Sequence, residues 1–401
     1  MGMQIGIVGK PNVGKSTFFC AATNAKVEIA NYPFTTIEAN KGVMYVAKPC
    51  PCKIFDVKCN PNNSKCINGT RYVPIEAIDV AGLVPDACKG KGLGNKFLDD
   101  LRQAHALIHI IDSSGGTDAE GNPCNNKDYD PIDDVLFLEK EITFWLLNII
   151  KKNWDTNARK CELEGKKIDK MLADQLTGLG ITDEHILKSI RKTKLDIGKP
   201  TKWTDDQILN FIDELRKNSK PMLIAFNKID KAKNDIEKKL IEIENKGYIA
   251  VPTSAESELA LTNAANKGLI KYKPGDDSFS IIDSSKLNDK QIKALNFIQK
   301  NILDKYGSTG IHKIIEKTVE MLKLIVVYPV EDETHLTDKE GRILPDAHFL
   351  KKGSTAKDLA YKVHTDIGDH FIRAIDAKTK RVIGSDYKLK DGDVIRIVTD
   401  A

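Results

Sequence analysis

The chain of 401 residues has no long apolar run, no strong charge imbalance and no internal repeat or low-complexity segment. Its longest apolar stretch, Phe144–Ile150, is interrupted by Asn148 and is far shorter than the roughly 20 residues that cross a membrane. The eight histidines show no spacing typical of a metal site or a catalytic constellation. The net charge of +4 permits nucleic-acid binding without requiring it. The length of the chain predicts two or three domains, and its 41% apolar residues are enough to form their packed cores.

A glycine-rich motif lies near the start of the chain. Gly9–Ser16 reads GKPNVGKS and fits the pattern G-x-x-x-x-G-K-[ST], directly after an apolar strand, Ile5–Val8, and before a helix-forming stretch, Thr17–Ala22. In such a loop the backbone N–H groups surround phosphate oxygens, Lys15 reaches the β and γ phosphates and the Ser16 hydroxyl binds Mg²⁺. The N-terminus of the following helix also favours an anion. The motif therefore predicts a nucleoside triphosphate site rather than an ordinary glycine-rich turn.

Three later motifs indicate which nucleotide is bound. A D-x-x-G sequence follows an apolar strand, so that Asp79 would hold magnesium through water and the N–H of Gly82 would contact the γ phosphate. Asn227–Asp230 reads NKID after a second apolar strand, and a carboxylate accepts hydrogen bonds only, which suits the adjacent donors of guanine and not adenine. In Ser254–Glu256 a backbone N–H would meet the guanine oxygen. Four elements in this order predict a guanine-nucleotide site.

The alternation of strands and helices around these motifs predicts an α/β P-loop NTPase domain with a mostly parallel sheet, formed by residues 1–122 and 221–322. Residues 123–220 are expected to form an α-helical insertion, in which a helix is opened by the capping box Thr204–Gln207. One apolar helix face of this insertion consists of Val135, Leu138, Ile142, Trp145 and Ile149. The stripe is too short to establish a coiled coil, which remains an alternative.

The last segment, residues 323–401, changes pattern again. Leu324–Tyr328 reads as a strand, Ser354–Val363 as a short helix and Asp393–Val398 as a closing strand after the turn Asp391–Gly392. This order predicts a small α+β module of the β-grasp type.

Several of these sequences together resemble the Obg-like GTPases of the YchF type, in particular their archaeal branch. The resemblance rests on Tyr32–Glu38, on the phosphate loop, on Asp79–Val84 and on the terminal segments Gly353–Ala356, His364–Gly368 and Leu389–Asp393, which are similar to the TGS domain. It implies GTP and GDP as ligands, Thr36 as a further magnesium ligand, and a ribosome or RNA as partner. No membrane or DNA partner is implied, and the oligomeric state is not indicated. Because the phosphate loop begins at residue 9, no room is left for a signal peptide and we expect a cytoplasmic protein.

Two positions bear on hydrolysis. Switch GTPases that orient the attacking water with a glutamine carry it directly after the D-x-x-G glycine, and this chain has Leu83 there, which forms no hydrogen bond. We therefore expect slow intrinsic turnover, with Lys15 and Gly82 stabilising the γ phosphate. Asn12 occupies the place where an asparagine ligates K⁺ in cation-activated GTPases, and a cation there would act like an arginine finger, worth on the order of 10³-fold. The alternative is that Asn12 braces the loop by bonds to the backbone.

Four of the cysteines form a candidate site for a second metal. Cys50, Cys52, Cys59 and Cys66 are dense enough to form a tetrahedral Zn²⁺ site, although the spacing differs from the usual pair of C-x-x-C knuckles. Reduced free thiols are the plainer reading, and redox sensing is a third.

The function expected from the sequence is a slow GTP-hydrolysing switch associated with a ribosome or RNA. The alternatives are an ATPase in stress or metabolic regulation, because many relatives replace the guanine-reading aspartate and prefer ATP, and a nucleotide-dependent binding module with negligible turnover. The predicted nucleotide contacts are Asn12, Val13, Gly14, Lys15, Ser16, Thr17, Asn227, Lys228, Asp230, Ser254, Ala255 and Glu256; the predicted magnesium ligands are Ser16, Thr36 and Asp79.

Overall fold

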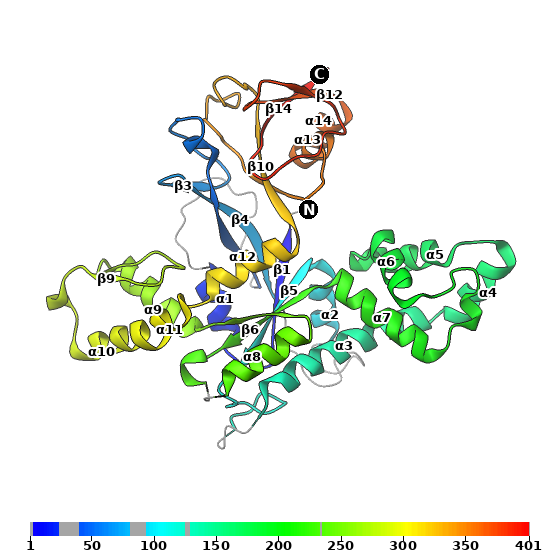
Figure 1. The fold of residues 1–401 in the computed structure, drawn as a ribbon, viewed down its shortest axis with the longest axis horizontal. Coiled ribbons are helices and arrows are strands. Elements are labelled where there is room, and N and C mark those ends of the chain that lie inside the picture. Colours follow the sequence, from blue (N-terminus) through cyan, green and yellow to red (C-terminus); the bar gives the residue numbers. More distant parts are fainter. Residues whose placement is uncertain (1–2, 24–39, 81–93, 125–128, 233–234, 401) are drawn as a thin grey trace. The chain divides into compact units, whose positions relative to one another are not determined.

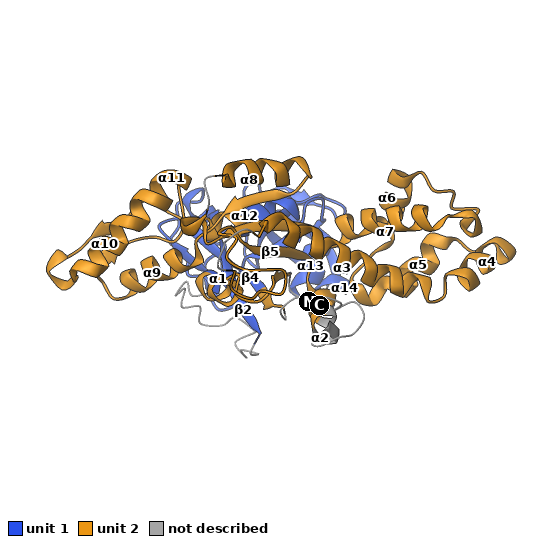
Figure 2. Ribbon diagram, turned by 90° about the horizontal axis from the view of Figure 1, so that it is seen from below, with its two compact units in different colours: residues 1–3, 22–76, 315–401 blue, residues 4–21, 77–314 orange. Residues whose placement is uncertain are grey.

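A computed structural model of the chain describes residues 3–23, 40–80, 94–124, 129–232 and 235–400. The chain divides into two compact units (Figure 2). Unit 1 contains residues 1–3, 22–76 and 315–401, and unit 2 contains residues 4–21 and 77–314. The predicted P-loop site therefore falls in unit 2, and the predicted terminal module falls in unit 1.

The centre of unit 2 is a parallel sheet. Its strands are β1 (Gln4–Val8), β5 (Ala106–Asp112), β6 (Met222–Asn227) and β7 (Ile249–Pro252), and each pairs in parallel with the next. Every residue of β5 and β6 is buried, as expected for a parallel sheet that is covered on both faces. In such a sheet the carboxyl ends of the strands lie at one edge, which is where ligands of α/β proteins bind. The predicted α/β class is confirmed.

Helices surround this sheet and extend unit 2 on two sides (Figure 1). They are α1 (Lys15–Thr23), α2 (Gly94–Gln103), α3 (Pro131–Lys151), α4 (Trp154–Glu164), α5 (Ile168–Leu176), α6 (Asp183–Thr193), α7 (Asp205–Ser219), α8 (Ile236–Asn245), α9 (Ala255–Asn266), α10 (Asp289–Ile298), α11 (Asp304–Tyr306) and α12 (Ile311–Met321), whose last residues belong to unit 1. None of the described helices is both long and apolar enough to cross a membrane.

The helices α3 to α7 lie between β5 and β6 in sequence, and residues 129–221, all described, contain no strand. Their apolar faces join the same core as the sheet, and Trp154 packs against Trp203 in a tilted arrangement with ring centroids 5.3 Å apart. The predicted capping box is present, since the Thr204 side chain accepts from the N–H of Gln207 and the Gln207 side chain accepts from the N–H of Thr204. Of the predicted apolar stripe, only Ile149 is not fully buried.

A second helical segment of unit 2 was not predicted from the sequence. The helices α9 and α10 enclose a two-stranded sheet formed by β8 (Ile270–Lys271) and β9 (Ser280–Ile281). This segment has a small core of its own, centred on Leu261, Leu295 and Ile302. Figure 1 shows it on the side of the β6 strand opposite to α4–α7.

Unit 1 begins with three strands, β2 (Lys41–Pro49), β3 (Lys65–Ile67) and β4 (Thr70–Asp79), the last of which leads into unit 2. β3 and β4 form an antiparallel hairpin joined by Asn68 and Gly69. Both turn residues have positive φ values, of 51° and 81°, which is the conformation that an Asn-Gly turn provides.

The C-terminal module (residues 324–399) has the predicted β-grasp topology. Its mixed sheet has the order β11-β10-β14-β12-β13, and α13 packs on the core formed by Val327, Leu359 and Ile395. The elements are β10 (Leu324–Val330), β11 (His348–Lys351), α13 (Ala356–Val363), α14 (Thr365–Asp369), β12 (Phe371–Asp376), β13 (Val382–Ile383) and β14 (Val394–Thr399). The predicted strand, helix and closing strand are all present within two residues of their expected bounds.

Candidate nucleotide-binding site

The glycine-rich loop connects the end of β1 to the start of α1. Gly14 has a φ of +91°, and a Cβ atom built on it would lie 2.5 Å from Nδ2 of Asn227, so both the conformation and the space require glycine here. The carbonyl of Gly14 accepts from the N–H of Phe18 at 2.8 Å, which places the loop directly at the N-terminus of α1. The side chain of Val13 is buried and anchors the loop. The free N–H groups of this helix end are therefore available to an anion.

Lys15 and Asp79 come together at the mouth of this loop. Asp79 is the last residue of β4, and the N–H of the next residue, Val80, donates to the carbonyl of Ile7 in β1 at 3.1 Å. The ammonium group of Lys15 forms an ion pair with the carboxylate of Asp79. The predicted residues Thr36, Gly82 and Leu83 lie outside the described residues.

Asn227 connects the phosphate loop to the base-reading loop. Its side chain is buried at the end of β6, donates from Nδ2 to the carbonyl of Val13 at 2.9 Å, and accepts at Oδ1 from the N–H of Ala255 at 3.1 Å. Three chain segments that are distant in sequence are thereby held by one amide. The side chain of this asparagine therefore positions the loops, and it also lines the cavity described below.

Lys228 also lies over the phosphate loop. Its φ of 58° turns the chain, and its ammonium group donates to the carbonyl of Asn12 at 2.7 Å and to the carboxylate of Asp112 at 2.8 Å. Asp112 is buried at the end of β5 and also accepts from the hydroxyl of Ser114 at 2.6 Å. Asp112 was not predicted as a site residue from the sequence.

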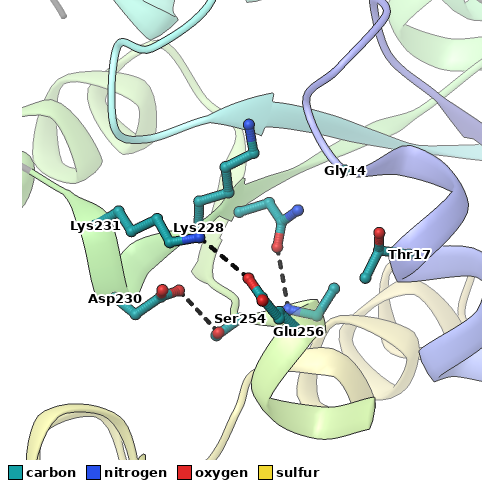
Figure 3. A pocket seen from close by; sticks show the side chains of 9 residues that line it. Gly14, Thr17, Lys228, Asp230, Lys231, Ser254 and Glu256 are labelled. Carbon is teal, nitrogen blue, oxygen red and sulfur yellow. Dashed lines mark hydrogen bonds and ion pairs between the residues drawn. The ribbon is translucent and has the colours of Figure 1, made fainter. Parts of the chain in front are cut away.

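Asp230 and the Ser254 segment line one cavity (Figure 3). The cavity has a volume of about 370 Å³ and is lined by Gly14, Thr17, Asn227, Lys228, Asp230, Lys231, Ser254, Ala255 and Glu256. Oδ1 of Asp230 accepts from the hydroxyl of Ser254 at 2.9 Å, which fixes the carboxylate. Lys231 and Glu256 form an exposed ion pair of 3.1 Å. Eight of the twelve predicted nucleotide contacts thus gather around one cavity, and Lys231 is a lining residue that was not predicted.

Asn12 is bonded on both its backbone and its side chain. It has a φ of 63°, and its Nδ2 donates to the carbonyl of Gly121 at 2.9 Å. Gly121 touches the loop closely, since a Cβ atom on it would lie 2.6 Å from the carbonyl oxygen of Pro11. The side-chain amide therefore braces the loop, and its carbonyl oxygen is the atom that suits a cation.

Lys10, in the phosphate loop, forms a buried ion pair with Asp134. Its ammonium group donates to Asp134 at 2.8 Å and to the carbonyl of Thr117 at 3.2 Å, and lies 3.8 Å from the centre of the Tyr129 ring. Burial raises the pKa of Asp134 to about 6, although the hydrogen bond from Lys10 and its charge act to lower this pKa. The helix α3 is thereby tied to the phosphate loop. Sequence reasoning missed this pair because its partners are 124 positions apart.

The four predicted cysteines lie together in unit 1. Their sulfur atoms are all within 4.8 Å of one another. Burial raises the pKa of the Cys50 thiol, and burial with a hydrogen bond to Cys66 raises the pKa of Cys59 to about 12. Burial also acts on Cys66, but hydrogen bonds from the other three thiols outweigh it and lower its pKa.

The fold and these loops define the class of a P-loop GTPase domain with an appended TGS module, and the comparisons with known proteins agree. Residues 4–148 match the family of 50S ribosome-binding GTPases, residues 225–332 match the G4 motif-containing domain of Obg-like GTPases of the YGR210-like type, and residues 335–399 match the TGS domain.

Relatives cover the whole chain. An uncharacterized GTP-binding protein of Methanocaldococcus jannaschii is 55% identical over 401 residues, with 99% of each chain covered. The ribosome-binding ATPase YchF of Buchnera aphidicola is 28% identical over 419 residues, again with 99% of each chain covered. The crystal structure of a GTP-binding protein from Pyrococcus horikoshii is 41% identical, covers 99% of this chain and 100% of its own, and has a TM-score of 0.79. The chain belongs to the YchF-like family of Obg-like GTPases, as its motifs predict.

Proposed function

We propose that this protein binds GTP, hydrolyses it slowly and uses the bound nucleotide to control its association with a ribosome or RNA. The observation that carries the proposal is the cavity beside the phosphate loop, in which the carboxylate of Asp230 is fixed by Ser254 and the N–H of Ala255 lies on the neighbouring segment. A ribosomal partner would place the protein in the cytoplasm.

Selection of the base would rest on Asp230. A carboxylate only accepts hydrogen bonds and has about four lone-pair sites, so the bond from Ser254 leaves capacity for the two adjacent N–H donors of guanine. Adenine presents an acceptor where guanine has one of those donors, and an acceptor facing a carboxylate would remain unpaired. The brace formed by Asn227 keeps this loop and the phosphate loop at a fixed separation, which favours a ligand that reaches both.

The phosphates would be bound by the loop and by Lys15. The residues present fit magnesium, because a hydroxyl at Ser16 and a carboxylate at Asp79 are the oxygen ligands that this hard cation takes, and Thr36 is the third candidate. When bound, Mg²⁺ would neutralise charge on the phosphate oxygens. Lys15 would exchange its ion pair with Asp79 for the β and γ phosphates, so that binding couples the loop to the end of β4.

Hydrolysis would be slow because Leu83 cannot orient water. The carbonyl oxygen of Asn12 suits K⁺, while its amide holds the loop through Gly121. The test is the hydrolysis rate in potassium and in sodium for the wild type and for Asn12→Ala. We expect faster hydrolysis in potassium that is lost in the variant. Equal rates in both salts would contradict a potassium role.

Two other functions are favoured by single observations. The Buchnera relative is named a ribosome-binding ATPase, which supports an ATPase reading for this family as well as a ribosomal partner. The absence of a glutamine at Leu83 favours a module that binds nucleotide with negligible turnover.

Competition between GTP and ATP for a fluorescent nucleotide, with magnesium and potassium present, separates these functions. We expect a preference for GTP of roughly a hundredfold or more, lost in Asp230→Ala. Asp235→Ala is the matched control, because Asp235 is exposed on the same segment and does not line the cavity. Tighter binding of ATP would assign the protein to the ATPases, and GTP binding without any turnover in potassium would favour the binding module.

A further inference from the structure

The four cysteines of unit 1 hold their sulfur atoms within 4.8 Å of one another, and two of these separations can be compared with those of a tetrahedral thiolate site. The sulfur atoms of Cys50 and Cys59 are 3.9 Å apart, and those of Cys52 and Cys66 are 3.8 Å apart. Zinc binds thiolates at about 2.3 Å, and a regular tetrahedron with that radius has edges of about 3.8 Å. Cys50 and Cys52 are buried and the other two are partly buried, which is typical of a closed structural site.

The backbone around the cluster supports the same arrangement. Cys50 and Cys52 belong to a tight turn that is tied to the β3–β4 hairpin, because the N–H of Cys50 donates to the carbonyl of Gly69 at 2.9 Å. The N–H of Val57 donates to the carbonyl of Cys52 at 3.0 Å and the N–H of Lys53 donates to the carbonyl of Cys50 at 3.2 Å, so the backbone of both cysteines is fixed by hydrogen bonds. Outer contacts that fix the backbone of metal ligands hold the ligand atoms in place.

A buried cation beside the cluster is a second, independent observation. Arg71 is 0% exposed, and its Nη2 donates to the carbonyl of Leu344 while its guanidinium lies 5.3 Å from the centre of the Tyr328 ring. Its Nε and Nη1 have no hydrogen-bond partner, and no carboxylate forms an ion pair with it within the described ranges. Burying a charge without a partner costs on the order of several kcal/mol of folding free energy. An anionic group near this guanidinium would offset that cost. A metal bound by four thiolates carries a net negative charge and supplies one.

We propose that Cys50, Cys52, Cys59 and Cys66 bind one Zn²⁺ ion, and that this ion fixes the loop on which the C-terminal module docks. Binding forms four Zn–S bonds and releases the four thiol protons to solvent, with no change of oxidation state. The proposal is independent of the function proposed for the nucleotide site.

The docking part of the proposal rests on the loop between Cys59 and Cys66. Three asparagines of this loop meet the segment 343–347 of the C-terminal module, and both belong to unit 1. The contacts are Asn60 N–H to the Ile343 carbonyl at 3.1 Å, Ile343 N–H to Asn60 Oδ1 at 2.6 Å, Asn62 N–H to the Pro345 carbonyl at 2.7 Å, Ala347 N–H to Asn63 Oδ1 at 2.9 Å and Asn63 Nδ2 to the Ala347 carbonyl at 3.1 Å. Because a cysteine flanks the loop at each end, an ion shared by both would hold it in this conformation.

The first test is the metal content of the full chain purified without chelator. We expect about one zinc per chain, and loss of that zinc in Cys52→Ser. Cys124→Ser is the matched control, because Cys124 is a partly buried thiol outside the cluster, and it should keep its zinc. Since Cys52→Ser risks misfolding, the wild type is also stripped of metal, reduced and given Co²⁺. The absorption of tetrahedral cobalt bound to thiolates is expected at one equivalent.

The second test measures hydrogen exchange at the docked backbone amides of Asn60, Asn62, Ile343 and Ala347. Removal of zinc should speed exchange at all four, and addition of zinc should restore protection. Asn63→Ala should loosen Ala347 while keeping the zinc, because Asn63 contacts the module and not the metal.

Three results would overturn the proposal. They are no stoichiometric metal together with no tetrahedral cobalt spectrum, a single iron in place of zinc, or disulfides joining Cys50 to Cys59 and Cys52 to Cys66. Unchanged exchange on zinc removal would overturn the docking role.

Discussion

In unit 2 several polar side chains around the nucleotide cavity bond to other segments of the chain, whereas in unit 1 the buried Arg71 near the cysteine cluster has two nitrogen atoms without a hydrogen-bond partner. Asn227 and Lys228 each bond to two other segments of the chain, so their loops are held by protein contacts alone. Arg71 keeps two nitrogen atoms unpaired beside four thiols. The nucleotide site is preorganised by protein contacts and can bind and release its ligand without losing its structure. The cysteine cluster has unpaired polar groups that a permanently bound ion would satisfy.

The largest effect that distinguishes the two regions should come from Lys15→Met. This change removes the cation expected to contact the β and γ phosphates, and we expect hydrolysis to fall by about 10²–10³-fold. Zinc content should be unchanged. Lys238→Met, an exposed lysine on α8, serves as control. Full turnover in Lys15→Met would exclude this lysine from the reaction.

Asn227→Ala tests preorganisation in unit 2. It leaves the carbonyl of Val13 and the N–H of Ala255 without their partner, and each such group costs about 1–3 kcal/mol. We expect the free energy of unfolding to fall by at least about 2 kcal/mol and GTP affinity to fall at least about 10-fold. Denaturant unfolding and nucleotide titration check both values against Asn245→Ala, an exposed asparagine. Unchanged affinity would mean that the brace does not matter to the ligand.

Arg71→Met tests the charge balance in unit 1. Removing the cation beside the thiolates should lower zinc affinity about 10-fold, in the range known for groups that support metal ligands. Competition with a zinc chelator measures it, with Lys58→Met as control because Lys58 is exposed next to Cys59. If both variants bind zinc as the wild type does, Arg71 has no part in the site.

Asp134 provides a smaller effect that depends on pH. Its usual pKa is 3.8 and burial raises it to about 6, so between these values the folded chain holds a proton that the unfolded chain has released. The free energy of unfolding due to this group therefore falls as the pH rises through this window, by up to about 1.4 kcal/mol per pH unit, and stays at its lower value above it.

The measurement for Asp134 is denaturant unfolding of the wild type and Asp134→Asn between about pH 4 and pH 7. The difference between them should change in the acid part of this range only. Asp133→Asn, the exposed neighbour, should run parallel to the wild type. A constant difference for Asp134→Asn would contradict the raised pKa.

Sequence patterns predicted the features that depend on local chemistry. The glycine-rich loop, the capping box at Thr204 and the elements of the terminal module follow from spacing, and the structure has them where they were expected. For the nucleotide site, the motifs also placed Asp230 and Ser254 together, because the ends of parallel strands meet at one edge.

The remaining features depend on packing between distant segments. Lys10 with Asp134 and Lys228 with Asp112 are pairs more than 100 positions apart, and no local pattern selects one partner over another. The cysteine spacing left zinc and free thiols as alternatives, and the tertiary structure that ties Cys50 to the hairpin at Gly69 brings the four sulfur atoms within 4.8 Å of one another. The helices around β8 and β9 were also not predicted, although α10 begins with a capping box formed by Asn288 and Gln291.

The central claim is that the carboxylate of Asp230 reads guanine, and Asp230→Asn tests it most directly when GTP and XTP binding are both measured. Xanthine has an oxygen where guanine has its exocyclic amine, so an amide at this position offers the donor that xanthine needs. The account predicts that the wild type prefers GTP and that Asp230→Asn prefers XTP, with the phosphate contacts unchanged. Equal affinity of the variant and the wild type for GTP, with no gain for XTP, would contradict it.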